Sequence, residues 1–344
     1  MELKNTNIDQ IKSTFSAYEP PSVDFKAELL ASGHINRTFK ILNNGKYYIL
    51  QKINALVFKN PQVITQNILT VSQHLKSKSY PHPVLKLLPF SDGHYWLENQ
   101  WRLFRFTGNS KTYEKVQSRK QAFEAAKFMG EFHFFLNNLD AHNIQDSIVG
   151  FLDFNSRTEQ FENALESASE ERLAQSKHEI KFIQDHRFIL EEWNGLLPKI
   201  PTRVIHADPK ISNFLFDEAD ENKVLALIDW DTIMAGTILY DFGDMVRSYT
   251  NLRKEDDPKN GNNFNKEYYL ALKDGFLVHL KNVLTDGEIF GLDLAAKTVV
   301  YIQAVRFLTD FLNNDVYYAT QSPGQNLDRT KNQLNLLRAI IDNQ

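Results

Sequence analysis

The chain has 344 residues, of which 42% are hydrophobic and 24% are charged, and its formal net charge is −4. This globular composition allows one large core or two smaller ones, and the slightly acidic balance disfavours nucleic acid or an anionic membrane as the main partner. Without cysteine, a signal-peptide pattern or an apolar run near the ~18 residues of a membrane span, the chain is expected to be cytoplasmic and to lack disulfides and thiolate chemistry.

The first hundred or so residues carry strand signals. Three short apolar or β-branched runs lie at residues 25–30, 38–42 and 47–53. Asn44-Gly45 separates two of these runs, which predicts a hairpin. A helix that begins with proline is predicted over 61–76 from its helical spacing of apolar residues. A second hairpin is predicted from 84 to 106, with its turn at Ser91-Asp92-Gly93.

From residue 117 onward the pattern is mainly helical. Helices are predicted from 117 and over 158–175, 178–196, 266–284, 294–313 and 327–341, with a short β segment at 202–231. The polar segment 254–263 is rich in helix breakers, which predicts either a disordered loop or a lid. We therefore predict an α+β, bilobal, protein-kinase-like fold. A nucleotide-binding lobe with an antiparallel sheet would occupy 1–106, and a helical catalytic and substrate-binding lobe 107–344.

The segment 206–213 carries the most informative chemistry of the chain. It reads His-Ala-Asp-Pro-Lys-Ile-Ser-Asn. Phosphoryl transfer requires a base for the attacking hydroxyl, a cation near the phosphate and oxygen ligands for Mg²⁺. Asp208 is the candidate base and Lys210 the candidate cation, while Asn213 and Asp229 are hard oxygen ligands suited to Mg²⁺. Any one of these residues alone is better explained as part of a solvated turn, but the set predicts an ATP- and Mg²⁺-dependent kinase.

Two acidic segments compete for the metal. Asp241-Phe-Gly243 spells the triplet that protein kinases use for Mg²⁺, but no strand leads directly into it. Asp229 directly follows the apolar run 224–228, so the metal is assigned to Asp229. Asp231 either joins it as a ligand or only supports it. Asp241 is predicted to brace the catalytic loop as a structural acid.

The N-terminal region offers a turn and a strand for the nucleotide. The turn at Gly33, His34 and Asn36 is suited to laying backbone N–H groups over the ATP phosphates, although an ordinary hairpin turn has the same composition. The segment 101–107 is the candidate hinge that binds adenine through its backbone. Such backbone contacts leave no side-chain signature.

Kinases also pair a strand lysine with a helix glutamate. Lys52 lies on a predicted strand, but strand alternation allows Gln51 to face the nucleotide instead. No Asp or Glu occurs from 53 to 91, so the usual ion pair cannot form. Gln66 of the following helix is the candidate hydrogen-bond partner of either side chain.

Several of these motifs together resemble the aminoglycoside phosphotransferase and choline kinase superfamily, and more closely its bacterial N-acetylhexosamine 1-kinase branch. The matching runs lie at 33–36, 48–54, 57–61, 206–217, 228–244, 306–310 and 315–317. The resemblance implies phosphorylation of a sugar, most closely an N-acetylhexosamine, at its anomeric hydroxyl. It also implies that Arg306 and Tyr317 contact the sugar. Arg306 and Asp310, four residues apart, would otherwise simply pair on a helix surface.

Three other functions compete with a sugar kinase. The first is a kinase that phosphorylates choline, ethanolamine or an aminoglycoside instead of a sugar. In another, the missing helix glutamate leaves a catalytically weak, pseudokinase-like binding module. A protein kinase is disfavoured because the chain has neither a G-x-G-x-x-G loop nor an A-P-E segment after Asp229.

Overall fold

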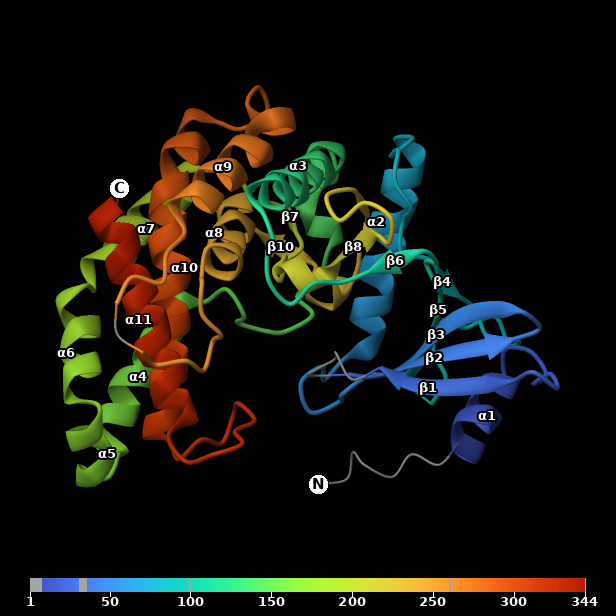
Figure 1. The fold of residues 1–344 in the computed structure, drawn as a ribbon, viewed down its shortest axis with the longest axis horizontal. Coiled ribbons are helices and arrows are strands. Elements are labelled where there is room, and N and C mark those ends of the chain that lie inside the picture. Colours follow the sequence, from blue (N-terminus) through green and yellow to red (C-terminus); the bar gives the residue numbers. More distant parts are fainter. Residues whose placement is uncertain (1–7, 31–35, 99, 260, 344) are drawn as a thin grey trace.

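The computed structural model describes residues 8–30, 36–98, 100–259 and 261–343. An antiparallel sheet forms one end of the molecule, and helices form the other (Figure 1). This arrangement confirms the predicted fold class. None of the helices in the described ranges is long and apolar enough to cross a membrane.

The N-terminal sheet has five antiparallel strands in the order β1-β2-β3-β5-β4. Its strands are β1 (Lys26–Leu30), β2 (Arg37–Asn43), β3 (Lys46–Lys52), β4 (Leu87–Leu88) and β5 (Trp101–Arg105). The same region contains the helices α1 (Ile8–Ser16) and α2 (Pro61–Ser77). The strands β1, β2 and β3 and the helix α2 confirm the sequence prediction. Asn44 and Gly45 both have positive φ, 49° and 68°, as the predicted tight hairpin requires.

The second predicted hairpin is confirmed in part, because β4 and β5 pair antiparallel and the Phe90 N–H donates to the His94 carbonyl at 2.8 Å across the predicted turn. Only β4 forms in its first arm, and the 95–97 segment contributes a single bridge between Leu97 and Trp101. The apolar run from 84 to 90 has only a two-residue partner on β5, so most of it lies outside the sheet. A strand requires a neighbour along its length, and its own sequence does not reveal how long that neighbour is.

The two faces of the sheet have different surroundings. Leu50 and Trp101 pack with Phe15 of α1 in a small core on the outer face. Ile49 and Phe104, on the inner face, join the main core that continues into the helical part. Because side chains alternate along a strand, the residues next to Leu50 and Trp101 also point inward.

The helical part surrounds two small sheets, β6-β8-β9 and β7-β10. Its strands are β6 (Ser110–Lys111), β7 (Arg203–Ile205), β8 (Phe214–Asp217), β9 (Val224–Leu227) and β10 (Met234–Gly236). Its α-helices are α3 (Arg119–Leu136), α4 (Phe154–Ser167), α5 (Glu170–Gln175), α6 (Lys177–Asp185), α7 (Phe188–Leu196), α8 (Ile238–Tyr249), α9 (Lys266–Leu280), α10 (Asp286–Leu312) and α11 (Gln325–Asn343). Its 3₁₀ turns are η2 (Ala141–Asn143), η3 (Leu197–Lys199), η4 (Ile211–Asn213) and η5 (Trp230–Thr232).

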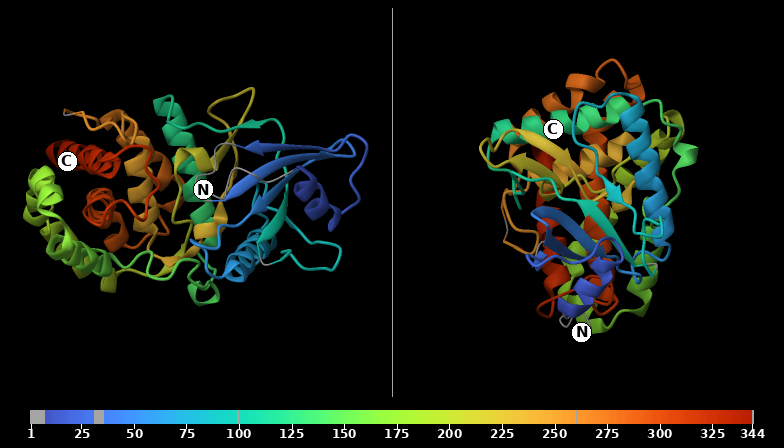
Figure 2. Two further views of the ribbon diagram at one scale, coloured as in Figure 1. Left: turned by 90° about the horizontal axis from the view of Figure 1, so that it is seen from below. Right: turned by 90° about the vertical axis from the view of Figure 1, so that its right-hand side faces the viewer.

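Helix α10 packs against α4, α7, α8 and α11, and α11 runs beside it. These helices lie at one end of the molecule, and the N-terminal sheet lies at the other (Figures 1 and 2). The predicted helices over 158–175 and 178–196 each divide into two. The loop predicted at 254–263 is held against α11, because Asn332 Nδ2 donates to the carbonyls of Lys254 and Asp257 at 2.8 and 3.0 Å.

Two glycines allow α3 and α9 to pack backbone to backbone. A Cβ at Gly275 would overlap the carbonyl oxygen of Phe123, and one at Gly130 would overlap the carbonyl oxygen of Phe276. Gly275→Ala is therefore expected to lower the free energy of unfolding by about 1–3 kcal/mol, measured by urea denaturation. In the matched control, Gly195→Ala in α7, the added methyl meets open space and a change of at most about 1 kcal/mol is expected. Equal effects of both substitutions would contradict this account of the packing.

Candidate active site

The loop after β7 brings three of the predicted residues together. Asp208 Oδ2 accepts hydrogen bonds from Lys210 Nζ at 2.7 Å and from Asn213 Nδ2 at 3.1 Å. Asn213 Nδ2 also donates to the backbone carbonyl of Asp208 at 2.8 Å. No side chain or backbone group in the described ranges donates to Asp208 Oδ1, so this oxygen is available to accept a proton.

His206 and Asp241 hold this loop from behind. His206 is fully buried, and its Nδ1 accepts the Asp208 N–H, so the proton lies on Nε2 and is donated to the Ile228 carbonyl at 3.0 Å. Burial lowers the pKa of His206, which agrees with this neutral tautomer. The Asp241 carboxylate accepts the N–H groups of His206 and Ala207 at 2.8 and 2.7 Å. The predicted bracing role of Asp241 is thus confirmed in the structure.

Asp229 lies two residues after the end of β9 and beside the same loop, since the Ile228 N–H between them donates to the Asn213 carbonyl at 2.9 Å. Its backbone is left-handed, with φ 61°, a conformation that L-residues adopt at a cost and that is common at functional sites. Although solvent reaches the side chain, the surrounding protein and the charge of Asp231 raise the pKa of Asp229 to about 7.

The free oxygens at this point suit a hard cation. The Asp229 carboxylate accepts no hydrogen bond from any described residue, and Asn213 uses only its Nδ2, which leaves Oδ1 unengaged. A carboxylate and an amide oxygen are ligands that Mg²⁺ prefers. Within the described ranges no three His, Asp or Glu side chains form a self-sufficient metal site. A Mg²⁺ ion would therefore complete its shell with water and substrate phosphate, as is common for this ion.

Arg102 of β5 is a site residue that the sequence reasoning missed. Its Nη2 lies 2.6 Å from each oxygen of Asp231, and both side chains are buried. Asn36 Nδ2 also donates to Asp231 Oδ2, at 2.6 Å. Both Asp231 oxygens are thus engaged, which favours the supporting role over direct metal ligation. The available signal was the charge of Arg102 within the run Trp101-Arg-Leu-Phe104, at an inward position of a mainly apolar strand.

The structure also bears on the choice between Gln51 and Lys52. Gln51 lies on the inner face, where its Oε1 accepts from Arg102 Nε at 2.9 Å. Lys52 Nζ lies over the ring of Trp101 on the outer face, 5.6 Å from its centre. The geometry therefore favours Gln51 on the nucleotide side. Gln66 is exposed and bonds within its own helix, so the expected hydrogen bond to Gln51 or Lys52 is wrong. Gly33 and His34 lie outside the described residues.

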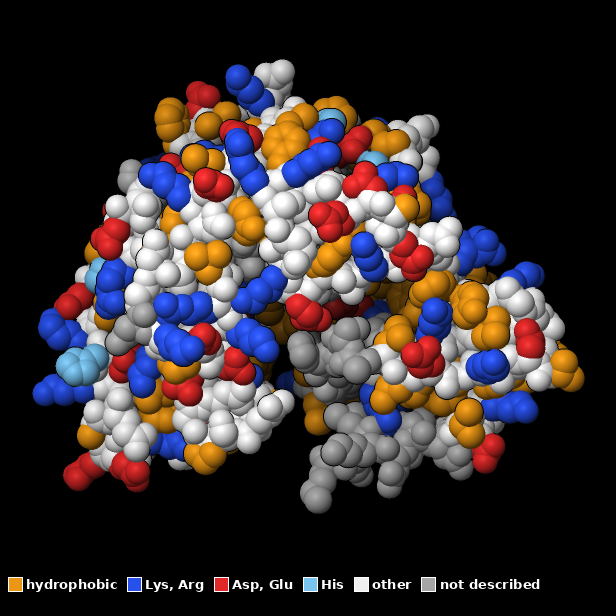
Figure 3. Space-filling view, in the orientation of Figure 1, with side chains coloured by type: hydrophobic (Ala, Val, Ile, Leu, Met, Phe, Trp, Pro, Cys, Tyr) orange, Lys and Arg blue, Asp and Glu red, His pale blue; other side chains and the backbone are white. Residues whose placement is uncertain are grey.

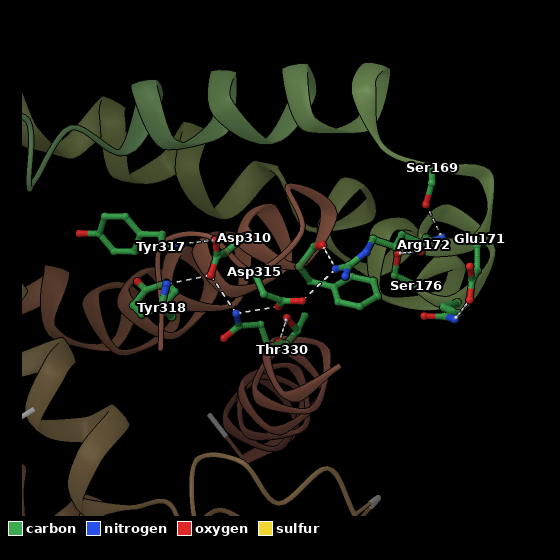
Figure 4. Close-up of polar contacts among 12 residues, drawn as sticks. Ser169, Glu171, Arg172, Ser176, Asp310, Asp315, Tyr317, Tyr318 and Thr330 are labelled. Atoms are coloured by element: carbon green, nitrogen blue, oxygen red, sulfur yellow. Dashed lines mark hydrogen bonds and ion pairs between the residues drawn. The ribbon is translucent and has the colours of Figure 1, made fainter. Parts of the chain in front are cut away.

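Arg306 of α10, which was predicted to contact the acceptor, faces aromatic rings. Its guanidinium lies 5.5 Å from the ring centre of Phe151 and 5.6 Å from that of Tyr318. Asp310 does not pair with Arg306; it accepts the N–H groups of Tyr317 and Tyr318 at 2.8 and 2.9 Å (Figure 4). The Tyr317 side chain is 61% exposed and points away from Asp310.

Tyr240 connects this aromatic region with the catalytic loop. Burial and the charge of Asp244 raise its pKa, while Arg306 acts in the opposite direction and Asp208 adds a smaller increase. The Tyr240 ring centre lies 6.0 Å from that of Phe151, the ring that the Arg306 guanidinium also faces. The next residue, Asp241, holds the loop that carries the candidate base. Figure 3 shows the surface hollowed between the sheet and the helical part, where acidic and basic side chains gather.

Residues 313–318, here called the acceptor loop, are fixed by a polar network. Asp315 accepts a hydrogen bond from Arg172 of α5 at 3.0 Å, and Asn326 Nδ2 bridges Asp315 and Asp310 (Figure 4). Asn314 and Asp315 both have positive φ, 68° and 59°. Asn and Asp are the residues besides glycine that adopt this conformation most readily, so the sequence permits the turn and the network holds it in place.

The chain matches the model of the phosphotransferase enzyme family over residues 26–272. It is similar in structure to a microcompartment-associated aminopropanol kinase, with a TM-score of 0.66, 14% identity and 98% of each chain covered.

Two further solved structures have the same overall likeness. One is a spectinomycin phosphotransferase in complex with ADP and spectinomycin, with a TM-score of 0.62, 11% identity and 98% of each chain covered. The other is a choline/ethanolamine kinase family protein from Mesorhizobium loti, with a TM-score of 0.59, 12% identity, and 97% of this chain and 94% of that chain covered. At these identities the likeness shows the fold, and it extends over nearly the whole chain.

Proposed function

Because this chain belongs to the phosphotransferase enzyme family, we propose that it transfers the terminal phosphoryl group of ATP to the anomeric hydroxyl of a sugar, an N-acetylhexosamine or a close relative. One observation carries the proposal of transfer. A carboxylate oxygen with no hydrogen-bond donor, Asp208 Oδ1, lies in the same loop as a bound lysine, Lys210, and next to the unpaired carboxylate of Asp229. These are the base, the cation and the metal ligand that phosphoryl transfer requires.

Asp208 and Lys210 have separate tasks in this mechanism. Asp208 Oδ1 accepts the proton of the acceptor hydroxyl, while Lys210 and Asn213 fix the orientation of the carboxylate through Oδ2. Burial alone would lower the pKa of Lys210, but the carboxylates of Asp208 and Asp229 outweigh it and raise this pKa. Lys210 thus stays protonated and stabilises the negative charge of the transferring phosphoryl group.

Asp229 and Asn213 would hold Mg²⁺ through the carboxylate and Oδ1. When bound, the ion neutralises charge on the ATP phosphates and orients them. Residues 1–106, including the turn at Gly33 and His34, would bind the nucleotide, and residues 107–344 would supply the base and the acceptor site. In this division the nucleotide would lie between the N-terminal sheet and the catalytic loop.

The charge of the acceptor region supports a sugar over an amine. Arg306 and Arg157 of α4 pair with no carboxylate among the described residues, and the pKa of Arg157 is lowered by burial and by the charge of Arg306. Choline, ethanolamine and aminoglycosides are cations, which two unpaired guanidinium groups repel. Sugar hydroxyls accept hydrogen bonds from guanidinium groups, and the exposed ring of Tyr317 offers an apolar face.

An acceptor panel tests this proposal directly. ADP release would be measured with Mg²⁺-ATP and each of N-acetylglucosamine, N-acetylgalactosamine, glucose, galactose, choline, ethanolamine and an aminoglycoside. Turnover with the N-acetylhexosamines, and a phosphorus NMR signal of a sugar 1-phosphate, are expected. Turnover confined to the amines would overturn the sugar assignment. Nucleotide binding without turnover on any acceptor would instead indicate a binding module.

Arg172→Met tests whether the acceptor loop contributes to substrate binding. Without Arg172 the loop loses its bond to α5, so we expect the KM for the sugar to rise by about 10- to 100-fold while the KM for ATP stays unchanged. Arg187→Met, which removes an exposed ion pair with Glu162, is the matched control and should change neither constant. An equal rise in both KM values for Arg172→Met would contradict a role specific to the acceptor.

A further inference from the structure

We propose that Arg102 is a positioning residue for phosphoryl transfer, because its ion pair with Asp231 joins the N-terminal sheet to the metal-binding segment. In this chain the pair replaces the strand lysine and helix glutamate that kinases use for the same purpose. The inference rests on the proposed function, since it assigns the nucleotide to the space between the sheet and the catalytic loop.

The ion pair connects two distant parts of the chain. Arg102 belongs to β5 of the sheet, and Asp231 belongs to η5, which directly follows Asp229. The exposed fractions of the two side chains are 1% and 4%. A buried charge is stable only when its partner is in place, so either side chain constrains the position of the other.

Three segments of the sheet region converge on this one contact. Gln51 of β3 accepts from Arg102 and is itself fixed by a 2.9 Å hydrogen bond to Thr38 of β2. Asn36 donates to Asp231 and accepts the N–H of Asn54 at 2.9 Å. The position of Asp231 is therefore set by the sheet as a whole rather than by one flexible side chain.

The contact also reaches the catalytic loop. Asp231 is two residues from Asp229, and its neighbour Thr232 donates to the His206 carbonyl at 2.8 Å. Arg102 Nη1 is buried and has no hydrogen-bond partner among the described residues, so Asp231 and Gln51 accept all of the hydrogen bonds that the guanidinium donates there. Loss of the ion pair should therefore release the sheet from the segment that carries the metal ligand.

This geometry predicts an effect on nucleotide binding. A site whose two walls are already held at the right spacing binds its ligand without the cost of ordering them. Because Arg102 lies behind Asp231 rather than at the phosphates, the loss of affinity should occur with and without Mg²⁺. In this arrangement Lys52, which lies on the outer face of the sheet, does not contact the phosphates.

The experiment measures the Kd of ADP by calorimetry, with and without Mg²⁺, for Arg102→Met, Asp231→Asn and the double variant. Each single substitution is expected to weaken ADP binding by about tenfold. The double variant should be no weaker than the poorer single variant, because both act through one contact. It also leaves no buried charge unpaired, so it should fold even where a single variant does not. Thermal unfolding is recorded for all three.

Arg105→Met is the matched control, since it makes the same change at an exposed position of the same strand, and its Kd should stay within about twofold. Additive losses for the two single substitutions would overturn the inference. So would a large loss of ADP affinity for Lys52→Met combined with none for Arg102→Met. Weakened ADP binding in a protein that phosphorylates no acceptor would refute the proposed transfer and limit the role of Arg102 to positioning the nucleotide site.

Discussion

Asp208→Asn is expected to lower kcat by about 10²–10⁴-fold, the contribution typical of a general base. The amide oxygen of asparagine is too weakly basic to accept the proton of the acceptor hydroxyl. It still accepts hydrogen bonds, so the contacts of Oδ2 with Lys210 and Asn213 can be retained. The loop should therefore keep its shape, and the Kd of ADP should change little.

The measurement combines turnover on the best acceptor of the panel with calorimetry of ADP binding. Asp185→Asn is a suitable control, because this aspartate lies in an exposed pair with Lys181 on α6 and should leave both quantities unchanged. Full turnover by Asp208→Asn would remove Asp208 from the role of base. Loss of ADP binding in parallel with turnover would indicate that the loop had collapsed.

The catalytic loop could be predicted from the sequence because its contacts are local. Asp208, Lys210 and Asn213 lie within one turn and bond to each other, so their spacing already contains the geometry. The hairpin at Asn44-Gly45 was predictable for the same reason, since both residues tolerate positive φ.

The contacts of Arg102 and Asn36 with Asp231 could not be predicted in the same way. The two residues meet Asp231 across 129 and 195 residues, a distance over which spacing carries no information. Only the tertiary fold brings the sheet to η5. The inward charge on β5 was a real signal, but a partner cannot be named from strand alternation alone.

The start of α10 was predicted too late, although the sequence signal for it is local. Thr285 and Glu288 form a capping box, in which each side chain accepts a backbone N–H of the other. The T-x-x-E pattern places the start of the helix at residue 286, earlier than the apolar spacing suggested. Capping chemistry thus defines a helix end that hydrophobic periodicity misses.

Asp229→Asn is expected to lower turnover and Asp241→Asn to lower stability, although each removes one aspartate charge near the catalytic loop. In Asp229→Asn turnover should fall by about 10³-fold or more, because the charged metal ligand is lost. Its stability should be retained or rise slightly. Asparagine tolerates the left-handed backbone, and the substitution removes a carboxylate that accepts no hydrogen bond from described residues and lies close to Asp231.

Asp241→Asn should instead lower the free energy of unfolding by about 3 kcal/mol, measured by urea denaturation. The fully buried carboxylate accepts the N–H groups of His206 and Ala207 and lies 3.1 Å from His133 Nε2. An asparagine has one acceptor oxygen, so its amide would face one of these donors. A stable Asp241→Asn protein with an altered Mg²⁺ requirement, beside an active Asp229→Asn, would move the metal to the Asp241-Phe-Gly243 segment.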